Sequence, residues 1–331
     1  MIRFLLITSA LWISSTAAQD RPPIIDMHLH ATGVSSFGGP LAVCTNEQDV
    51  HFPGLDPRIP ISVERTQVCE SPLQSAATDA ELIESTVEML DNYNIFAVTD
   101  GTLDELAQWR AASPTRIIPA MDFKVTGGPS PAEFRSLFQE DAFQVFAEVS
   151  PQYRGKLATD EALDKYFALA EELDIPIGFH LGEGPAGGQH HSFSSGYRAA
   201  VTSPLQLEEV LIKYPKLRIY VMHYGSPLVE DMIALLYSHP QVYVDIAQNN
   251  WGFPRQHFYR QLRMLVDAGF QKRIMFGSDQ MIWPEAIRIA IETVEGADFL
   301  SAEQKRDIFY YNAARFLRLT DAQIAAHHGK K

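Results

Sequence analysis

The feature that most constrains the fold is a regular alternation of short apolar runs with amphipathic segments. The runs expected as strands are 24–30, 95–100, 116–123, 143–149, 176–181, 218–224, 242–246 and 273–279. The segments expected as helices are 79–90, 102–112, 131–138, 160–173, 204–214, 228–238, 254–268 and 301–319. Apolar strands that alternate with helices favour a parallel sheet covered by helices.

Eight such units are the repeat number of a (β/α)8 barrel, and the length of 331 residues agrees with that fold. We therefore predict an α/β protein, a single TIM-barrel domain over residues 19–331 with a long loop after the first strand. An open doubly wound sheet is the alternative, but no Gly-x-Gly-x-x-Gly follows an early strand. The helix at 301–319 is expected to pack outside the barrel, and the tail 325–331 to be frayed with His327 and His328 on the surface.

The loop after the first strand, residues 31–78, is rich in Pro, Gly and Ser and has no sustained periodicity, which is typical of a functional loop or lid. It contains the only two cysteines, Cys44 and Cys69. In an oxidising compartment these would form one disulfide that closes a long loop. Two buried free thiols are the alternative.

The first 18 residues have the pattern of a secretory signal peptide. Arg3 precedes an apolar run at 4–13, and small residues follow up to Ala18, after which cleavage is expected. An uncleaved membrane anchor is the alternative. We expect an exported protein, periplasmic or secreted. Cleavage changes the net charge from −14 to −15, because Arg3 is lost and no acid is. A protein this acidic should repel nucleic acid and anionic membranes.

Polar side chains end several of the apolar runs, where barrel enzymes place their chemistry. They are His28, His30, Glu148, His180, His223 and Asp279. Four imidazoles and two carboxylates at one rim would suit a divalent metal such as zinc.

Each of these residues also has an ordinary explanation. A lone buried histidine such as His180 or His223 is often merely hydrogen-bonded, Glu148 could pair with Arg154, and Asp279 could cap a following helix. Their coincidence at five strand ends favours metal binding.

These motifs resemble the amidohydrolase superfamily, in its family-2 or aminocarboxymuconate-semialdehyde-decarboxylase-like branch. The matching stretches are Ile-Asp-x-His-x-His at 25–30, Phe-His at 179–180, Met-His-Tyr-Gly at 222–225, Phe-Gly-Ser-Asp at 276–279 and Tyr-Asn-Ala-Ala-Arg-Phe-Leu at 311–317. The resemblance implies that His28, His30, His180 and Asp279 hold a metal, while His223 binds a second ion or polarises the substrate. Glu148 departs from the one-metal pattern and resembles the bridging carboxylate of the phosphotriesterase-like branch, so one and two ions both remain open.

We therefore expect a metal-dependent hydrolase that cleaves an amide, ester or lactone of a small organic substrate with a metal-activated water. Asp279 is the expected general base, and His223 is expected to help stabilise the oxyanion. The alternatives are non-oxidative decarboxylation of an unsaturated or aromatic acid at the same site, and an exported barrel that binds metal without catalysis.

Substrate-binding residues are the least constrained part. Residues expected on the segments around the barrel mouth are Lys124, Arg154, His190 and Trp251. His190 and His191 are expected to be an exposed pair that contacts substrate. The sequence does not indicate the oligomeric state, although homodimers are common among barrels of this kind.

Overall fold

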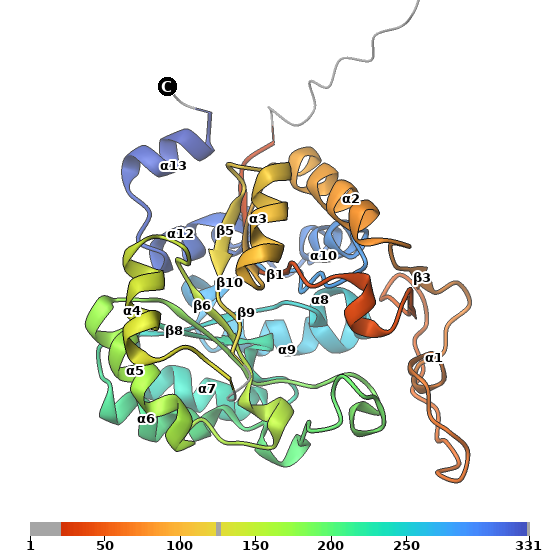
Figure 1. The fold of residues 1–331 in the computed structure, drawn as a ribbon. Coiled ribbons are helices and arrows are strands. Elements are labelled where there is room, and N and C mark those ends of the chain that lie inside the picture. Colours follow the sequence, from red (N-terminus) through yellow and green to blue (C-terminus); the bar gives the residue numbers. More distant parts are fainter. Residues whose placement is uncertain (1–20, 124–126, 330–331) are drawn as a thin grey trace, which may run out of the picture.

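The computed structural model describes residues 21–123 and 127–329, and its core is eight parallel strands (Figure 1). One sheet has the order β1 (Ile24–His30), β4 (Ile95–Asp100), β5 (Ile117–Ala120). The other has the order β10 (Ile274–Met275), β9 (Val242–Asp245), β8 (Ile219–Met222), β7 (Ile177–His180), β6 (Phe146–Val149). The predicted signal peptide, residues 1–18, lies outside the described residues.

Both junctions between the two sheets are bridged by the backbone. Ala120, at the end of β5, forms a parallel bridge with Val145, just before β6. On the other side, the amide of Met27 in β1 donates to the carbonyl of Phe276, after β10, over 2.9 Å. These links join the eight strands into a ring, which confirms the predicted (β/α)8 fold.

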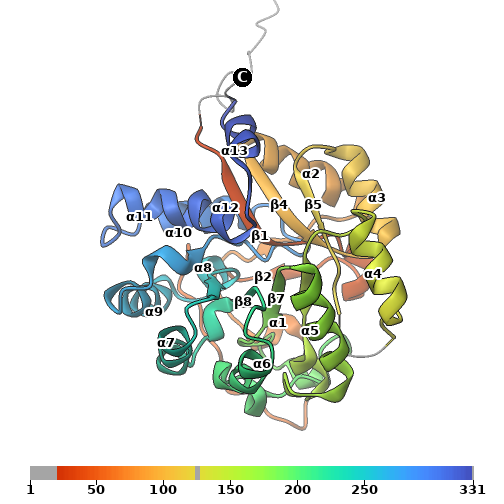
Figure 2. The same ribbon diagram turned by 90° about the vertical axis from the view of Figure 1, so that its left-hand side faces the viewer.

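Helices surround the strands in chain order (Figure 2). They are α2 (Asp79–Asn92), α3 (Leu103–Ala112), α4 (Pro131–Gln139), α5 (Glu161–Leu173), α6 (Glu208–Lys213), α7 (Val229–Ser238), α9 (Arg255–Asp267) and α10 (Ala286–Glu295). Capping explains several of their starts: the side chains of Thr102 and Ser130 form capping boxes at α3 and α4. No helix in the described part of the chain is long and apolar enough to cross a membrane.

The last strand is shorter than the predicted 273–279. The amide of Phe276 leaves the ladder and donates to the carbonyl of Ile308 over 2.8 Å. Asp279 then adopts a left-handed backbone with φ of 51°. These two departures end β10 at Met275, and they set Asp279 on the segment that follows it.

The C-terminal segment is helical as predicted, with a π-helical turn in its middle. It consists of α11 (Ala302–Arg306), a π-helical turn η8 (Asp307–Tyr311) and α12 (Asn312–Phe316). Tyr310, Ala313 and Phe316 belong to the same buried cluster as the strand residues Ile25 and Met275. This segment therefore packs against the strands.

The tail is ordered rather than frayed, because α13 (Asp321–His327) docks through its last residue. The ring of His327 stacks on Phe96 with centroids 3.7 Å apart. Its Nδ1 forms a hydrogen bond with the hydroxyl of Tyr310 over 2.9 Å. The composition of the tail does not predict this stacking, because Phe96 lies far from His327 in the sequence.

The long segment after β1 carries the short strands β2 (Ala42–Val43) and β3 (Leu73–Gln74) and the helix α1 (Val63–Thr66), on the right in Figure 1. Cys44 and Cys69 form the predicted disulfide, with Cα atoms 5.9 Å apart. The base of the segment is fixed to the barrel, since the indole of Trp283 donates to the carbonyl of Leu41 over 3.0 Å.

Candidate metal centre

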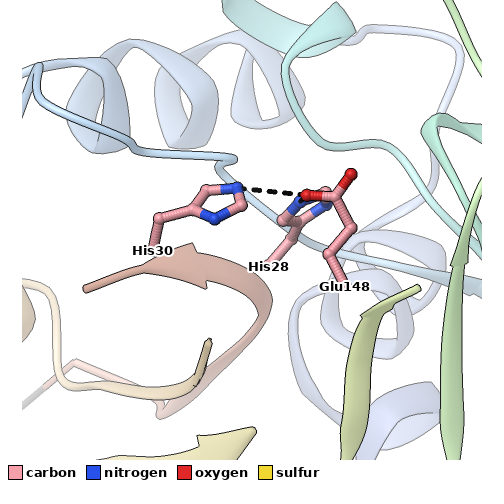
Figure 3. A group of neighbouring side chains, drawn as sticks. All are labelled: His28, His30 and Glu148. Atoms are coloured by element: carbon pink, nitrogen blue, oxygen red, sulfur yellow. Dashed lines mark ion pairs between the residues drawn. The ribbon is translucent and has the colours of Figure 1, made fainter. Parts of the chain in front are cut away.

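Six side chains converge at the carboxyl ends of the strands, as predicted. They are His28 and His30 in β1, Glu148 in β6, His180 at the end of β7, His223 after β8 and Asp279 after β10. Figure 3 shows Glu148 facing both histidines of β1.

The carboxylates lie between the imidazoles. Asp279 Oδ1 is 2.8 Å from His30 Nε2 and 3.5 Å from His28 Nε2. Glu148 Oε2 is 3.8 Å from His30 Nε2 and 3.9 Å from His28 Nε2. The other oxygen, Oε1, is 3.7 Å from His180 Nε2. Glu148 thus faces histidines from two separate strands, the placement expected of a carboxylate shared between two ions.

The fourth imidazole closes the cluster. The ring centroid of His223 is 5.1 Å from that of His28 and 4.7 Å from that of His180. A side chain at Gly182 would come within 2.7 Å of His223 Cβ, so glycine is required for this approach. His223 itself has a φ of 57°, an uncommon conformation for a non-glycine residue and one that often accompanies function.

Each β1 histidine is oriented by a carboxylate behind it. Asp245 Oδ2, at the end of β9, lies 3.1 Å from His28 Nδ1. Asp100 Oδ1, at the end of β4, lies 2.7 Å from His30 Nδ1. A carboxylate can only accept, so Nδ1 carries a proton in both rings, and Nε2 faces the cluster.

The other two histidines are held in the same way by neutral acceptors. His180 Nδ1 is 3.0 Å from Gln152 Oε1, and His223 Nδ1 is 3.0 Å from the carbonyl of Ala247. The amide group of Gln152 donates to the carbonyl of Gly182, which fixes its Oε1 as the acceptor. All four rings therefore turn Nε2 toward the cluster, and in its neutral form each ring would offer an Nε2 lone pair, the form in which histidine binds metal.

The cluster fits a divalent ion on its own geometry. Within the described residues, His28 Nε2 is buried and has no hydrogen-bond partner, an arrangement that costs about 1–3 kcal/mol unless something binds there. Possible ligand atoms lie within 4.8 Å of one another in two overlapping sets, His28 with His30 and Glu148, and His28 with His223 and Asp245. Imidazole nitrogens and carboxylate oxygens suit zinc and related divalent ions.

Electrostatics keep the carboxylates ionised. Burial opposes the charge on Glu148, but His180, His28 and His30 hold its pKa well below the usual value. Burial also disfavours the charged form of His30, yet Asp100 and Asp279 raise its pKa to about 10. A metal must therefore displace a proton from His30, so acid should weaken metal binding.

His180 shifts the other way. Burial lowers its pKa to about 4, and the neighbouring His223 and His28 add to that effect although Glu148 opposes it. At neutral pH His180 is therefore uncharged, with its Nε2 lone pair available toward Glu148.

A cavity of about 450 Å³ opens onto the cluster. Seven of the residues that line it are aromatic: Phe37, Phe52, Tyr153, Phe193, Trp251, Phe253 and Trp283. The disulfide-closed segment contributes Phe52, Thr66 and Gln67, so this segment forms part of the cavity wall.

The four residues predicted to bind substrate are placed differently. Arg154 and Trp251 line the cavity, and the indole of Trp251 donates to the carbonyl of Ser278 over 2.5 Å. His190 is exposed and is not brought to the cavity wall. Lys124 lies outside the described residues.

His191 is not exposed, contrary to the expectation for the pair. It is 5% exposed, and its Nε2 is 2.9 Å from the carbonyl of Ala186 in the same loop. That contact shapes the loop, which explains why the histidine turns inward.

Sequence reasoning missed the residues that orient the histidines. Asp100 and Asp245 are the last residues of β4 and β9, so the strand-end argument that found the ligands could also have found them. Gln152 lies in a 3-10 turn, η2 (Pro151–Arg154), and carries no such signal.

Comparison with known proteins agrees with this geometry. A family model described as Amidohydrolase matches residues 25–319. No curated protein matches the chain.

Several solved structures share the fold at low sequence identity. A probable 2-pyrone-4,6-dicarboxylic acid hydrolase from Acinetobacter baumannii, with citric acid bound, superimposes with a TM-score of 0.58 and 14% identity, covering 89% of this chain and 99% of that one. A 4-oxalomesaconate hydratase from Rhodopseudomonas palustris gives 0.56 and 16%, covering 92% and 98%. A 5-carboxyvanillate decarboxylase from Novosphingobium aromaticivorans, complexed with manganese, gives 0.51 and 18%, covering 70% and 79%.

Proposed function

The chain belongs to the amidohydrolase family and is a metal-dependent enzyme, and from that premise we propose that it hydrolyses an amide, ester or lactone of a small organic substrate. The observation that carries the choice of hydrolysis is the position of Glu148. Its two oxygens face histidines of β1 and β7 at 3.7–3.9 Å, which suits a two-ion hydrolytic site. Zinc is the proposed ion, and manganese is the first alternative to test.

The residues that would hold the ion or ions are His28, His30, Glu148, His180, His223 and Asp279. A bound divalent ion would lower the pKa of water and polarise a carbonyl oxygen.

Asp279 is the proposed base. Burial alone would raise its pKa, but His28, His30 and His223 lower it, so Asp279 is ionised at neutral pH and can accept a proton. In the proposed reaction it takes a proton from the attacking water and later gives it to the leaving group. This use of one carboxylate for both steps removes the need for a side-chain nucleophile.

The role of His223 becomes narrower. Its Nδ1–H donates to the carbonyl of Ala247, so the neutral ring has no second N–H to offer an oxyanion. We assign His223 to metal binding rather than to direct polarisation of the substrate.

The cavity supports a substrate with an apolar, ring-sized body. Arg154 lines the same cavity, and no ion pair involving it occurs among the described residues, so it can meet an anionic group of the substrate. Trp251 would pack against the apolar body. The Cys44–Cys69 disulfide supports the proposal that the chain is exported into an oxidising compartment.

Non-oxidative decarboxylation is the second candidate, and Arg154 is the observation in its favour, because that reaction needs a cation for a substrate carboxylate. A panel of lactones, esters, amides and aromatic acids, assayed for both acid release and carbon dioxide release, separates the two. Acid release from a neutral ester or lactone supports hydrolysis. Carbon dioxide as the only product would overturn it.

A further inference from the structure

We propose that Tyr153 is a catalytic residue that donates a hydrogen bond from its phenol hydroxyl to the oxyanion formed at the scissile carbonyl. The inference rests on the proposed hydrolysis and adds the donor which that reaction lacks.

Tyr153 lies beside the metal cluster. It lies in η2, five residues after Glu148 of β6, and it lines the cavity that opens onto the cluster. Its ring packs edge-on against His180, with centroids 4.9 Å apart. The phenol is thus a direct neighbour of the metal cluster.

The hydroxyl of Tyr153 differs from those of Tyr197 and Tyr166 in its hydrogen bonding. Buried tyrosine hydroxyls normally find an acceptor. Tyr197 donates to the carbonyl of Gly182 over 3.1 Å, Tyr166 to that of Pro129 over 2.7 Å. Over residues 21–123 and 127–329, no group is hydrogen-bonded to the hydroxyl of Tyr153, and its side chain is partly open to the cavity. The hydroxyl is therefore available to a ligand.

The proposed reaction needs a hydrogen-bond donor to the oxyanion. The four site imidazoles commit Nδ1–H to protein acceptors and turn lone pairs to the centre, so in their neutral form they cannot donate to a developing oxyanion. Preorganised donors at that oxygen are a main source of rate enhancement in acyl transfer. Tyr153 is a neutral donor adjacent to the cluster.

Tyr153 is held in place by contacts to both its backbone and its ring. The amide of Tyr153 donates to the carbonyl of Ser150 over 3.2 Å. The loop at Gly196 passes so close that a Cβ there would lie 2.1 Å from the Tyr153 carbonyl oxygen. Tyr197 packs on the ring at 5.7 Å between centroids. Because its backbone is held by these contacts and its ring packs against His180 and Tyr197, Tyr153 can present its hydroxyl without reordering during the reaction.

The balance of the reaction is simple. The oxygen of water forms a bond to the carbonyl carbon and its proton goes to Asp279. The bond to the leaving group then breaks, and the leaving group receives that proton. Tyr153 keeps its own O–H bond throughout and only hydrogen-bonds the oxygen that carries the negative charge.

Tyr153→Phe tests the proposal, with Tyr166→Phe as the matched control, because each replacement keeps an aromatic ring and removes one hydroxyl, and Tyr166 lies in α5 and does not line the cavity. On the best ester or lactone from the panel, Y153F should lower kcat about 10²–10³-fold, the usual effect of losing one oxyanion donor. KM, metal content and melting temperature should stay near wild type. Y166F should keep kcat within about threefold. A Y153F enzyme that retains wild-type kcat would overturn the assignment.

A second readout separates this inference from the proposed reaction. A phenyl methylphosphonate imitates the tetrahedral oxyanion, and its affinity for metal-loaded protein can be measured by calorimetry without turnover. Binding should weaken at least tenfold in Y153F and stay unchanged in Y166F. If wild type hydrolyses nothing but shows this difference, the reaction is wrong and the donor stands. If Y153F binds the phosphonate as wild type does, or wild type does not bind it, the donor role is wrong.

Discussion

At the scale of single residues, the site is defined by the atoms behind the ligands. Asp245, Asp100, Gln152 and a backbone carbonyl each hold one Nδ1, so four Nε2 atoms point inward together. Partners of this kind fix both the tautomer and the ring orientation of a ligating histidine. The metal affinity of this site should therefore depend on residues that never touch the ion.

Asp245→Asn tests this dependence. Asparagine can still accept from the amide of His223, as Asp245 Oδ1 does over 2.8 Å, but its amide nitrogen would oppose the Nδ1–H of His28. We expect metal affinity to fall about 10–100-fold with the fold intact. Titration against a chromophoric chelator measures this, and an unchanged affinity would contradict the account.

Asp279→Asn tests the base. The variant should lose about 10²–10⁴-fold in kcat, because the amide cannot accept a proton, while most of the metal is retained through the other ligands. Asp104→Asn, on the exposed side of α3, is the control and should match wild type. Activity near wild type in D279N, with metal bound, would remove Asp279 from the mechanism.

At the scale of elements, two segments beyond the eight repeats shape the molecule. The disulfide-closed segment after β1 forms part of the cavity wall, and the C-terminal segment packs against strand residues such as Ile25 and Met275. The first was expected as a lid from its composition. The second was not, because a helical period indicates that one face is buried without indicating against what.

Replacing both Cys44 and Cys69 by serine tests the first segment. The disulfide spans a sequence separation of 25, for which loop closure predicts a stabilisation of roughly 3 kcal/mol. Since Phe52, Thr66 and Gln67 lie between the two cysteines and line the cavity, KM should rise several-fold while kcat changes little. Denaturant unfolding and steady-state kinetics measure both effects. An unaltered KM would mean that this segment does not shape the substrate site.

His327 gives α13 a pH dependence. Burial, with His328 and Arg116, lowers its pKa from 6.5 to about 4, so the folded state binds a proton more weakly than the unfolded chain does. Its contribution to stability is therefore complete above pH 6.5 and is lost as the pH falls from 6.5 toward 4.

His327→Gln should flatten this part of the stability profile. The difference in unfolding free energy between wild type and variant should shrink as pH drops from 8 to 5, as followed by urea unfolding at each pH. Curves that stay parallel would show that His327 does not titrate with folding.

At the scale of the whole molecule, the sequence predicted the barrel because strand and helix periods alternate eight times. It predicted that His28, His180 and Asp279 converge, because the ends of parallel strands meet at one rim. It could not predict Gln152 as the partner of His180, the position of Tyr153 or the burial of His191. Those depend on contacts between loops far apart in sequence, which no local period encodes.

The most direct test of the central claim is metal content and hydrolysis measured on the same sample of purified protein, before and after chelation and again after readdition of zinc or manganese. We predict at least one divalent ion per chain, loss of activity and a lower melting temperature on removal, and recovery of both on readdition, since an ion that binds only the folded state stabilises it. A protein that is metal-free as purified and hydrolyses its substrate equally well in chelator would contradict the account.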